Sequence, residues 1–252
     1  GVVKHRLWNY ETLTAAAALA GMTERIGVFA TVHVPLVHPV MAAKMLTTID
    51  HASGGRAGVN IVCGWNQEDF DMFGMKIIEH DDRYQQGEEW FELIRRILAG
   101  GDEPFDYDTT YYPGLKGVVG QPGSLQQPYP ATLSASYSPR GRDFAVKNSD
   151  FLLLGHVAEG ESTAEIDDIN ARATAAGRAK PPGVLCTLAP FIRESRAEAE
   201  AYHRHFAIDH ADPVAMAAYR RLRAPNASSA GIETDRGALA MASGGFPVVG
   251  TP

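Results

Sequence analysis

Hydrophobic and polar positions along the chain follow two different periods in turn. Short apolar runs rich in β-branched residues predict strands at residues 26–31, 57–63, 132–136, 151–154 and 184–192, and residues 1–3 read as the end of another strand. Between these runs, apolar residues recur at helical spacing, which predicts helices at residues 11–21, 39–49, 82–98, 139–147, 163–176, 196–209 and 213–223. Alternation of strands and helices of this kind is typical of a parallel sheet.

Two architectures contain such a sheet: a closed barrel and an open doubly wound sheet. No G-x-G-x-x-G or G-x-x-x-x-G-K-[ST] loop follows any predicted strand, which disfavours the doubly wound alternative. The chain starts on Gly1 instead of Met, and its last residues, 246–252, read as a linker. We therefore expect one (β/α)8 TIM barrel domain over residues 1–252, a fragment that lacks the first and last strands.

Composition and charge narrow the class of protein. The chain has 252 residues and a formal net charge of −7, from 23 Lys and Arg against 30 Asp and Glu. Without a Lys/Arg cluster, nucleic acid and anionic membranes are poor partners. The longest apolar runs are too short to span a bilayer. Cys63 and Cys186 form no Cys-x-x-Cys pair, which favours a reducing compartment and predicts a cytoplasmic protein.

Candidate catalytic residues lie where predicted strands end, because barrel enzymes place their chemistry at the carboxyl ends of the strands. Lys4, Thr31 and the segment 60–65 occupy such positions. Asn60 interrupts an apolar strand, and a buried amide without partners costs roughly 1–3 kcal/mol. Its side chain could serve a ligand or a neighbouring loop.

Two further segments have the residue types of a phosphate site. Arg83 and Tyr84 open a predicted helix, and Ser138 precedes Pro139 at the start of another. Helix N-termini, hydroxyl groups and guanidinium groups bind phosphate well. The structural alternative is that Arg83 pairs with the neighbouring Asp81 or Asp82, either of which could also cap the helix.

Other conspicuous residues have open or structural interpretations. His33 and His38 either line a pocket or pack at a strand exit, and Cys63 reads as a buried structural thiol. The nine histidines include no H-E-x-x-H pattern, and we expect no metal site. We interpret His203, His205 and His210 as exposed helix residues.

A long polar segment, residues 100–123, is rich in Gly, Pro and Tyr. Loops of this length inside a compact domain are usually functional. We expect this one to help close over a substrate through Tyr107, Tyr111 and Tyr112.

Four stretches of the sequence carry a resemblance to a known family. They are T-I-D-H-A-S-G-G-R followed by G-V-N-I-V-C-G-W-N at residues 48–66, A-T-V-H-V-P at 30–35, H-D-D-R-Y at 80–84 and S-Y-S-P-R-G-R-D-F at 136–144. Together they resemble the bacterial luciferase-like flavin monooxygenases, and most closely the branch with pyrimidine, alkanesulfonate and sulfone monooxygenases. The resemblance is strong over residues 3–150 and looser beyond.

The resemblance implies a flavin site at the mouth of the barrel. By position, Val3 and Lys4 match a flavin-contacting strand end, and Asn60 matches a flavin-facing Asn. Thr31 matches a Thr that lines an oxygen pocket together with that Asn, with Lys4, Thr31 and Asn60 as the catalytic set.

The same resemblance assigns the remaining flavin contacts. Arg83, Tyr84 and Ser138 match residues around the FMN ribityl chain and phosphate. Asp69 falls where pyrimidine-cleaving relatives have a Glu, and the shorter side chain alters that contact.

The implied activity is oxygenation of a small organic substrate, a sulfonate, a sulfone or a nitrogen heterocycle, by O2 and reduced FMN. A separate NAD(P)H:flavin reductase would supply the reduced FMN, and the protein would be a homo-oligomer. Two alternatives stay open: a deazaflavin (F420)-dependent hydride-transfer oxidoreductase on the same barrel, and a flavin-binding protein without catalytic activity.

Overall fold

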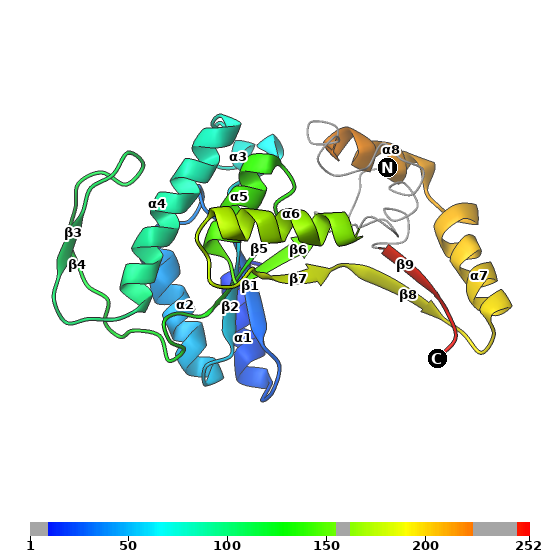
Figure 1. Ribbon diagram of the computed structural model, residues 1–252, viewed down its shortest axis with the longest axis horizontal. Helices are drawn as coiled ribbons and strands as arrows, with labels where there is room; N and C mark the ends of the chain where they lie inside the picture. The colour runs from blue at the N-terminus through cyan, green and yellow to red at the C-terminus, as the bar shows by residue number, and fades with distance from the viewer. Residues whose placement is uncertain (1–9, 155–161, 224–245) are drawn as a thin grey trace. The chain divides into compact units, whose positions relative to one another are not determined.

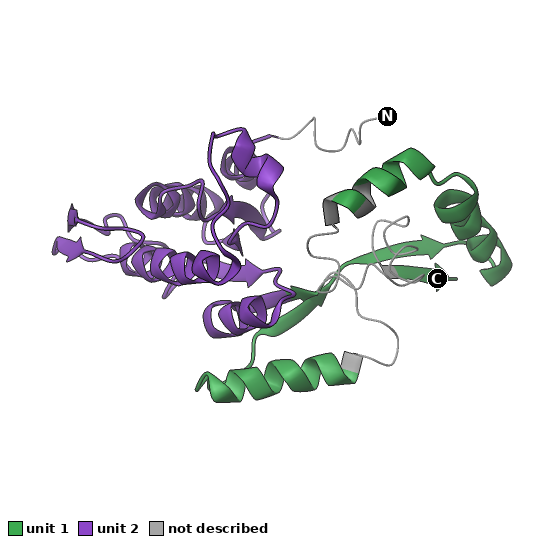
Figure 2. Cartoon of the chain, turned by 90° about the horizontal axis from the view of Figure 1, so that it is seen from above, with its two compact units in different colours: residues 1–9, 153–252 green, residues 10–152 purple. Residues whose placement is uncertain are grey.

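The computed structural model describes residues 10–154, 162–223 and 246–252. It divides into two compact units, one of residues 10–152 and one of residues 1–9 and 153–252, which Figure 2 draws in purple and green. The prediction that residues 1–252 form a single domain stays a prediction.

The unit of residues 10–152 is built on parallel strands. β1 (Val28–His33) pairs with β2 (Ala57–Val62), β2 pairs with β5 (Ala131–Ser134), and β5 pairs with β6 (Phe151–Leu154), every pair parallel. Within this unit the strand order is β1-β2-β5-β6, and these strands do not close into a ring. The predicted parallel sheet is confirmed, and its strands lie within a few residues of the predicted positions.

Helices connect these strands (Figure 1), as the spacing of apolar residues predicts. α1 (Thr12–Met22) precedes β1, α2 (Pro39–Ser53) joins β1 to β2, and α5 (Pro139–Asn148) joins β5 to β6. α3 (Gln67–Asp71) and α4 (His80–Leu98) follow β2. The short helix α3 was not predicted, since five residues are too few for a helical period to show.

One face of each strand packs on these helices and the other is partly open. In β1 and β2, buried residues alternate with more exposed ones: Val28, Ala30 and Val32 are buried, whereas Thr31 and His33 are half-buried. The buried positions join a core with α2 and α4 that includes Leu46, Trp90, Phe91 and Ile94. The polar strand residues therefore lie on the face away from the helices.

The segment 100–123 is not the irregular loop that its composition predicts. It contains an antiparallel hairpin of β3 (Phe105–Tyr107) and β4 (Leu115–Val118). Tyr107 and Tyr112 are buried, and the Tyr107 hydroxyl donates to the backbone oxygen of Glu89 in α4 at 2.8 Å. Tyr107 thus packs the hairpin on α4, and the expectation that Tyr107, Tyr111 and Tyr112 help to close over a substrate stays a prediction.

The described part of the other unit contains α6 (Ser162–Ala175), β7 (Gly183–Cys186), β8 (Leu188–Ile192), α7 (Arg196–Arg204), a π-helical turn at His205–Asp209, α8 (Pro213–Arg223) and β9 (Phe246–Gly250). The single strand expected at residues 184–192 is therefore two strands. The expected linker at residues 246–252 is also wrong in part, because β9 pairs parallel with β8 from Phe246 to Gly250. Both helices expected between residues 196 and 223 are present.

Candidate functional site

Thr31 and Asn60 form the centre of the candidate site. They are register partners in the adjacent parallel strands β1 and β2, and the Asn60 amide nitrogen donates to the Thr31 hydroxyl at 3.1 Å. The Asn60 amide oxygen is buried and has no hydrogen-bond partner among the described residues. An unsatisfied buried acceptor costs roughly 1–3 kcal/mol, so this oxygen is available to a ligand that brings an N–H or O–H.

His33 lies two residues beyond Thr31 on the same face of β1, since alternate residues of a strand share a face. Its ring nitrogen Nδ1 is buried without a hydrogen-bond partner among the described residues. Burial lowers the pKa of His33, and the negative charge of Asp69 in α3 opposes that shift. Because the net direction is downward, the imidazole is neutral at neutral pH. We call Thr31, His33 and Asn60 the strand-end face.

Arg83 connects the first turn of α4 to the end of β2. Its guanidinium Nη1 donates to the backbone oxygen of Gly64 at 2.6 Å, and its Nε is buried without a partner among the described residues. Gly64 has φ of 97°, and a Cβ there would lie 2.7 Å from the Phe70 ring, so only glycine fits. The contact with Gly64 places Arg83 at the same carboxyl edge of the sheet as the strand-end face.

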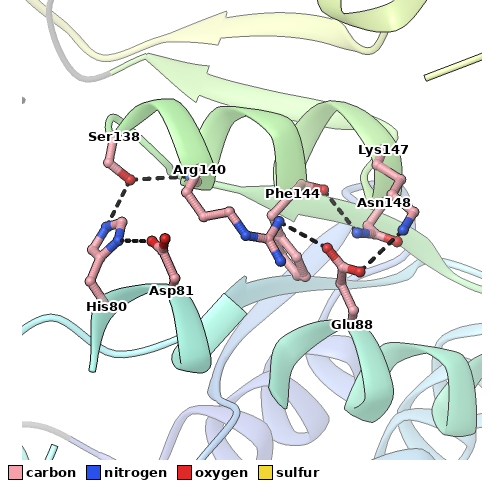
Figure 3. A network of polar contacts seen from close by, with 9 residues as sticks. His80, Asp81, Glu88, Ser138, Arg140, Phe144, Lys147 and Asn148 are labelled. Carbon is pink, nitrogen blue, oxygen red and sulfur yellow. Dashed lines mark hydrogen bonds and ion pairs between the residues drawn. The ribbon is translucent and has the colours of Figure 1, made fainter. Parts of the chain in front are cut away.

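Ser138 lies at the start of α5, where its hydroxyl oxygen accepts from the backbone N–H of Gly141 at 3.1 Å as the N-cap. Figure 3 shows the His80 ring between Ser138 and Asp81. His80 Nε2 lies 2.9 Å from the Ser138 hydroxyl, and its Nδ1 lies 2.7 Å from the Asp81 carboxylate. The start of α4 therefore contacts the start of α5 through a hydrogen-bonded chain of three side chains.

Tyr84 also lies where the start of α4 meets the start of α5. Its ring packs on His80 and Phe144, with ring centroids 5.2 and 5.6 Å away. A Cβ on Gly141 would lie 2.4 Å from the Tyr84 hydroxyl, so the hydroxyl closely approaches the backbone of α5. Burial raises the pKa of Tyr84, with hydrogen bonds to Ser138 and Ser136 opposing the shift, and the phenol stays a neutral donor.

An ion-pair cluster on the same two helices fixes their separation. Glu88 of α4 pairs with Arg140 at 2.9 Å and with Lys147 at 3.1 Å, both from α5 (Figure 3). Arg140 also lies over the Tyr84 ring, 5.8 Å from its centroid. These contacts hold Tyr84 and Ser138 in place relative to each other.

The structure brings Tyr84 and Ser138 together, and Arg83 contacts the Gly64 backbone oxygen. The assignment of these three residues to the FMN ribityl chain and phosphate stays a prediction. Sequence reasoning missed His80, although it stands one helical turn before Tyr84, where it shares a face with that residue. The N-cap of α4 is Glu79 and not Asp81 or Asp82, which lie in the first turn.

Other predicted residues stand apart. Val3 and Lys4 lie outside the described residues. Asp69 is half-buried in α3, and its assignment as a flavin contact stays a prediction. His38 accepts from the backbone N–H of Val40 at 3.3 Å as the N-cap of α2, and its ring packs on Tyr112. The packing interpretation of His38 therefore holds.

Cys63 is buried, and burial raises the pKa of its thiol to about 12. A Cβ on Gly87 would lie 2.6 Å from the Cys63 sulfur, so the thiol packs directly on the α4 backbone. A thiol with so high a pKa is not a nucleophile at neutral pH. The structural interpretation of Cys63 is supported.

Asp50, at the other end of the motif 48–66, has a structural environment. It is fully buried in α2. One carboxylate oxygen accepts from the backbone N–H groups of Leu125 and Gln126 at 2.7 and 3.0 Å, and the other accepts from the Gln126 side chain at 2.7 Å. Asp50 thus holds the segment before β5 against α2.

Arg56, like Asp50, has a structural role near the amino-terminal end of β2. Its guanidinium donates to the backbone oxygens of Ala20, Thr23, Ile26 and Ser53 at 2.6–2.9 Å. These oxygens come from the end of α1, the turn before β1 and the end of α2. Arg56 therefore anchors the amino-terminal ends of β1 and β2.

The three histidines near residue 205 make ring contacts. His203 packs on Phe191 with ring centroids 4.6 Å apart, and the His205 and His210 ring centroids lie 3.9 Å apart at an interplanar angle of 48°. In the described parts of the chain no group of three or more His, Cys, Asp or Glu could hold a metal ion. Within those same parts, no helix has both the length and the apolar character needed to cross a membrane.

Comparison with known proteins places these residues in context. The family model described as "Luciferase-like monooxygenase" matches residues 2–252. The chain is 34% identical over 209 residues to the FMNH2-dependent dimethylsulfone monooxygenase of Pseudomonas putida, covering 82% of this chain and 56% of that protein. It is 33% identical over 171 residues to a pyrimidine monooxygenase of a Bradyrhizobium strain, covering 64% and 44%. The chain spans about half the length of the curated relatives it matches.

Solved structures are similar in fold. A riboflavin lyase with modified FMN and riboflavin superposes with a TM-score of 0.82 at 23% identity, over 97% of this chain and 65% of that one. A long-chain alkane monooxygenase superposes with a TM-score of 0.82 at 21% identity, over 99% and 64%. At such low identity these similarities show the fold alone.

Proposed function

Because the chain belongs to the luciferase-like monooxygenase family, we propose that it is a monooxygenase that uses reduced FMN and O2. The fold is the TIM barrel of that family, which agrees with the predicted fold class. The family does not by itself fix the cofactor or the substrate, so the proposal depends on the candidate site.

The observation that carries the proposal is the Thr31–Asn60 pair with its unsatisfied amide oxygen at the carboxyl edge of the sheet. Reduced flavin carries ring N–H groups, and Asn60 offers a buried acceptor for one of them. At the same edge, Arg83 keeps a buried Nε–H without a partner among the described residues. The described residues therefore fit a ligand with an N–H-bearing ring and an anionic tail.

Bound reduced flavin supplies the electrons with which O2 is activated, and the protein supplies position and charge. Asn60 orients the ring, and Thr31, whose hydroxyl accepts from the Asn60 amide, directs its own O–H toward oxygen. In this proposal Lys4 adds positive charge where negative charge develops on oxygen, and Val3 contacts the flavin.

The anionic end of the cofactor would bind between α4 and α5. Arg83 contributes a guanidinium group, Tyr84 a neutral hydroxyl and Ser138 a hydroxyl at a helix N-terminus, where phosphate is favoured. We propose Asp69 as a further flavin contact from α3.

The substrate and partners follow from the relatives and remain part of the proposal. Relatives of this chain are named for dimethylsulfone, dibenzothiophene sulfone and pyrimidines. We therefore propose a small sulfone, sulfonate or nitrogen heterocycle as substrate, a separate NAD(P)H:flavin reductase as the source of reduced FMN, and a homo-oligomer as the assembly.

Anaerobic fluorescence titration tests the cofactor. The protein should bind reduced FMN and should then consume O2 and form product when dimethylsulfone or uracil is present. Tight binding of F420 with no binding of reduced FMN would replace the proposal by the hydride-transfer alternative. Oxygen consumption that yields hydrogen peroxide alone with every substrate would favour a flavin-binding protein without oxygenase activity.

A further inference from the structure

His33 is not among the proposed flavin contacts, yet it belongs to the strand-end face with Thr31 and Asn60. It is on the same face of β1 as Thr31, whose hydroxyl accepts a hydrogen bond from the Asn60 amide nitrogen. It stands two residues nearer to the carboxyl end of the strand, opposite Val62 in the register of β2. Since strand ends form the mouth of a barrel, a substrate approaching the flavin passes His33.

The His33 ring is built to meet a ligand. Its Nδ1 is buried and makes no hydrogen bond with any residue in the described part of the chain. The other half-buried histidine of this edge, His80, has both ring nitrogens engaged, by Ser138 and Asp81. His38, the next histidine along the chain, uses its Nδ1 to cap α2. His33 thus differs from its neighbours in keeping a buried ring nitrogen without a protein partner.

The charge around His33 distinguishes between classes of ligand. Burial keeps the imidazole neutral, and the charged group that acts on it within the described residues is the carboxylate of Asp69. A neutral imidazole can donate or accept a hydrogen bond but forms no ion pair, so it suits an uncharged hydrogen-bonding group better than an anion.

We propose that His33 is a substrate-binding residue that hydrogen-bonds an uncharged substrate, such as a sulfone or the amide edge of a pyrimidine. This inference rests on the proposed function, because it assigns the substrate class of the same site. It narrows the three proposed substrate classes to two, sulfones and nitrogen heterocycles, and removes sulfonates.

Binding can be measured without turnover. Imidazole ¹⁵N resonances of the purified protein, assigned with His33→Ala, should show a neutral His33 ring at neutral pH. Dimethylsulfone or uracil should shift that resonance in the presence of FMN, and methanesulfonate at equal concentration should not. A His33 ring that responds to none of these probes, or to methanesulfonate most strongly, overturns the inference.

Kinetics with reduced FMN and O2 give a second readout. His33→Ala should raise the KM for the uncharged substrate about tenfold, while kcat and the affinity for reduced FMN stay within about twofold. His33→Asn, whose amide nitrogen can replace the ring N–H, should recover part of the loss.

His51→Gln is the matched control, because His51 is exposed and bonds the Gly123 backbone oxygen at the amino-terminal end of β2. It should leave KM and kcat unchanged. If the wild-type protein binds reduced FMN and forms product but His33→Ala keeps the wild-type KM, the substrate-binding role of His33 is wrong while the proposed function stands. If the wild-type protein binds no reduced FMN, the proposed function fails, and the ¹⁵N titration repeated without FMN still decides whether His33 binds the probes.

Discussion

The two ends of the β1–β2 strand pair differ in how the polar groups there are satisfied. At the amino-terminal end, both carboxylate oxygens of Asp50 accept hydrogen bonds, and Arg56 donates to four backbone oxygens. At the carboxyl end, Asn60 and His33 each keep a buried polar atom without a partner among the described residues. Asp50 and Asn60 are only ten positions apart in the sequence, yet the polar groups at the first end all have partners and those at the second do not.

This difference separates stability from chemistry within a single motif. A buried polar group with all partners present stabilises the fold, and removing it leaves its partners unsatisfied. A buried polar group without partners costs stability and is retained where a ligand supplies the missing bond. The conspicuous Asp-His-Ala-Ser-Gly-Gly-Arg run therefore identifies the family, whereas Asn60 and His33 report on function.

The largest effect should come from the amino-terminal end of the strand pair. Asp50→Ala removes three hydrogen bonds to a buried carboxylate and leaves two backbone N–H groups of the segment 125–126 unsatisfied. Hydrogen bonds to charged groups contribute about 1.5–3 kcal/mol each, and losses at one residue are not additive, so we expect a loss of about 4 kcal/mol. Urea denaturation followed by circular dichroism measures the free energy of unfolding.

Asp71→Ala is the control for that variant. Asp71 is an exposed carboxylate that bonds the Gln67 side chain one turn away. Its removal should change the free energy of unfolding by no more than about 0.5 kcal/mol. Equal losses in the two variants would refute the structural role given to Asp50.

A smaller effect is expected where α4 and α5 meet. A methyl group in Gly141→Ala would lie 2.4 Å from the Tyr84 hydroxyl, so Tyr84 must move away from the start of α5. Overpacking of this kind costs about 1–3 kcal/mol. The affinity for reduced FMN should fall about tenfold as the Tyr84 hydroxyl is displaced, as measured by fluorescence titration.

Gly21→Ala provides the comparison, since nothing lies within 4 Å of a Cβ at that position in α1. It should leave reduced-FMN affinity unchanged. Should Gly141→Ala bind reduced FMN as tightly as the wild type, Tyr84 and Ser138 do not hold the phosphate.

The smallest effect concerns the Cys63 thiol, which directly follows the carboxyl end of β2. Burial raises the pKa of Cys63 to about 12, so almost none of this thiol is in the reactive thiolate form between pH 7 and 9. Iodoacetamide at pH 8 should label the exposed Cys186 and leave Cys63 unlabelled in the folded protein, as read by mass spectrometry. Rapid labelling of Cys63 would show that the β2 end is more open than its burial indicates.

Most of the parallel sheet and its helices could be predicted because their signals are local. The helix of residues 39–53 has Pro39 at its first position and an apolar stripe, and β2 is an unbroken apolar run apart from Asn60. The hairpin at Phe105–Tyr107 and Leu115–Val118 could not, since strands of three and four residues are too short for alternation to show. β9 was missed because Pro247 argues against a strand.

The candidate site could be predicted in its residue types and not in its contacts. Helix starts and strand ends pointed to Arg83, Tyr84 and Ser138. The carbonyl of Gly64 that holds Arg83, and the His80 ring beside Ser138, depend on tertiary placement. Nor can a sequence show that the Asn60 oxygen lacks a partner, because that requires the position of every neighbour.

The central claim is that Asn60 serves the ligand and not the fold, and one pair of values from Asn60→Ala tests it most directly. Turnover of reduced FMN and O2 with a confirmed substrate should fall about 100-fold, the loss typical of one hydrogen-bonding group that stabilises charge in a transition state. The free energy of unfolding should stay within about 1 kcal/mol of the wild type or rise, because an unsatisfied buried oxygen is removed. Unchanged turnover with a loss of several kcal/mol, as expected for Asp50→Ala, would contradict the account.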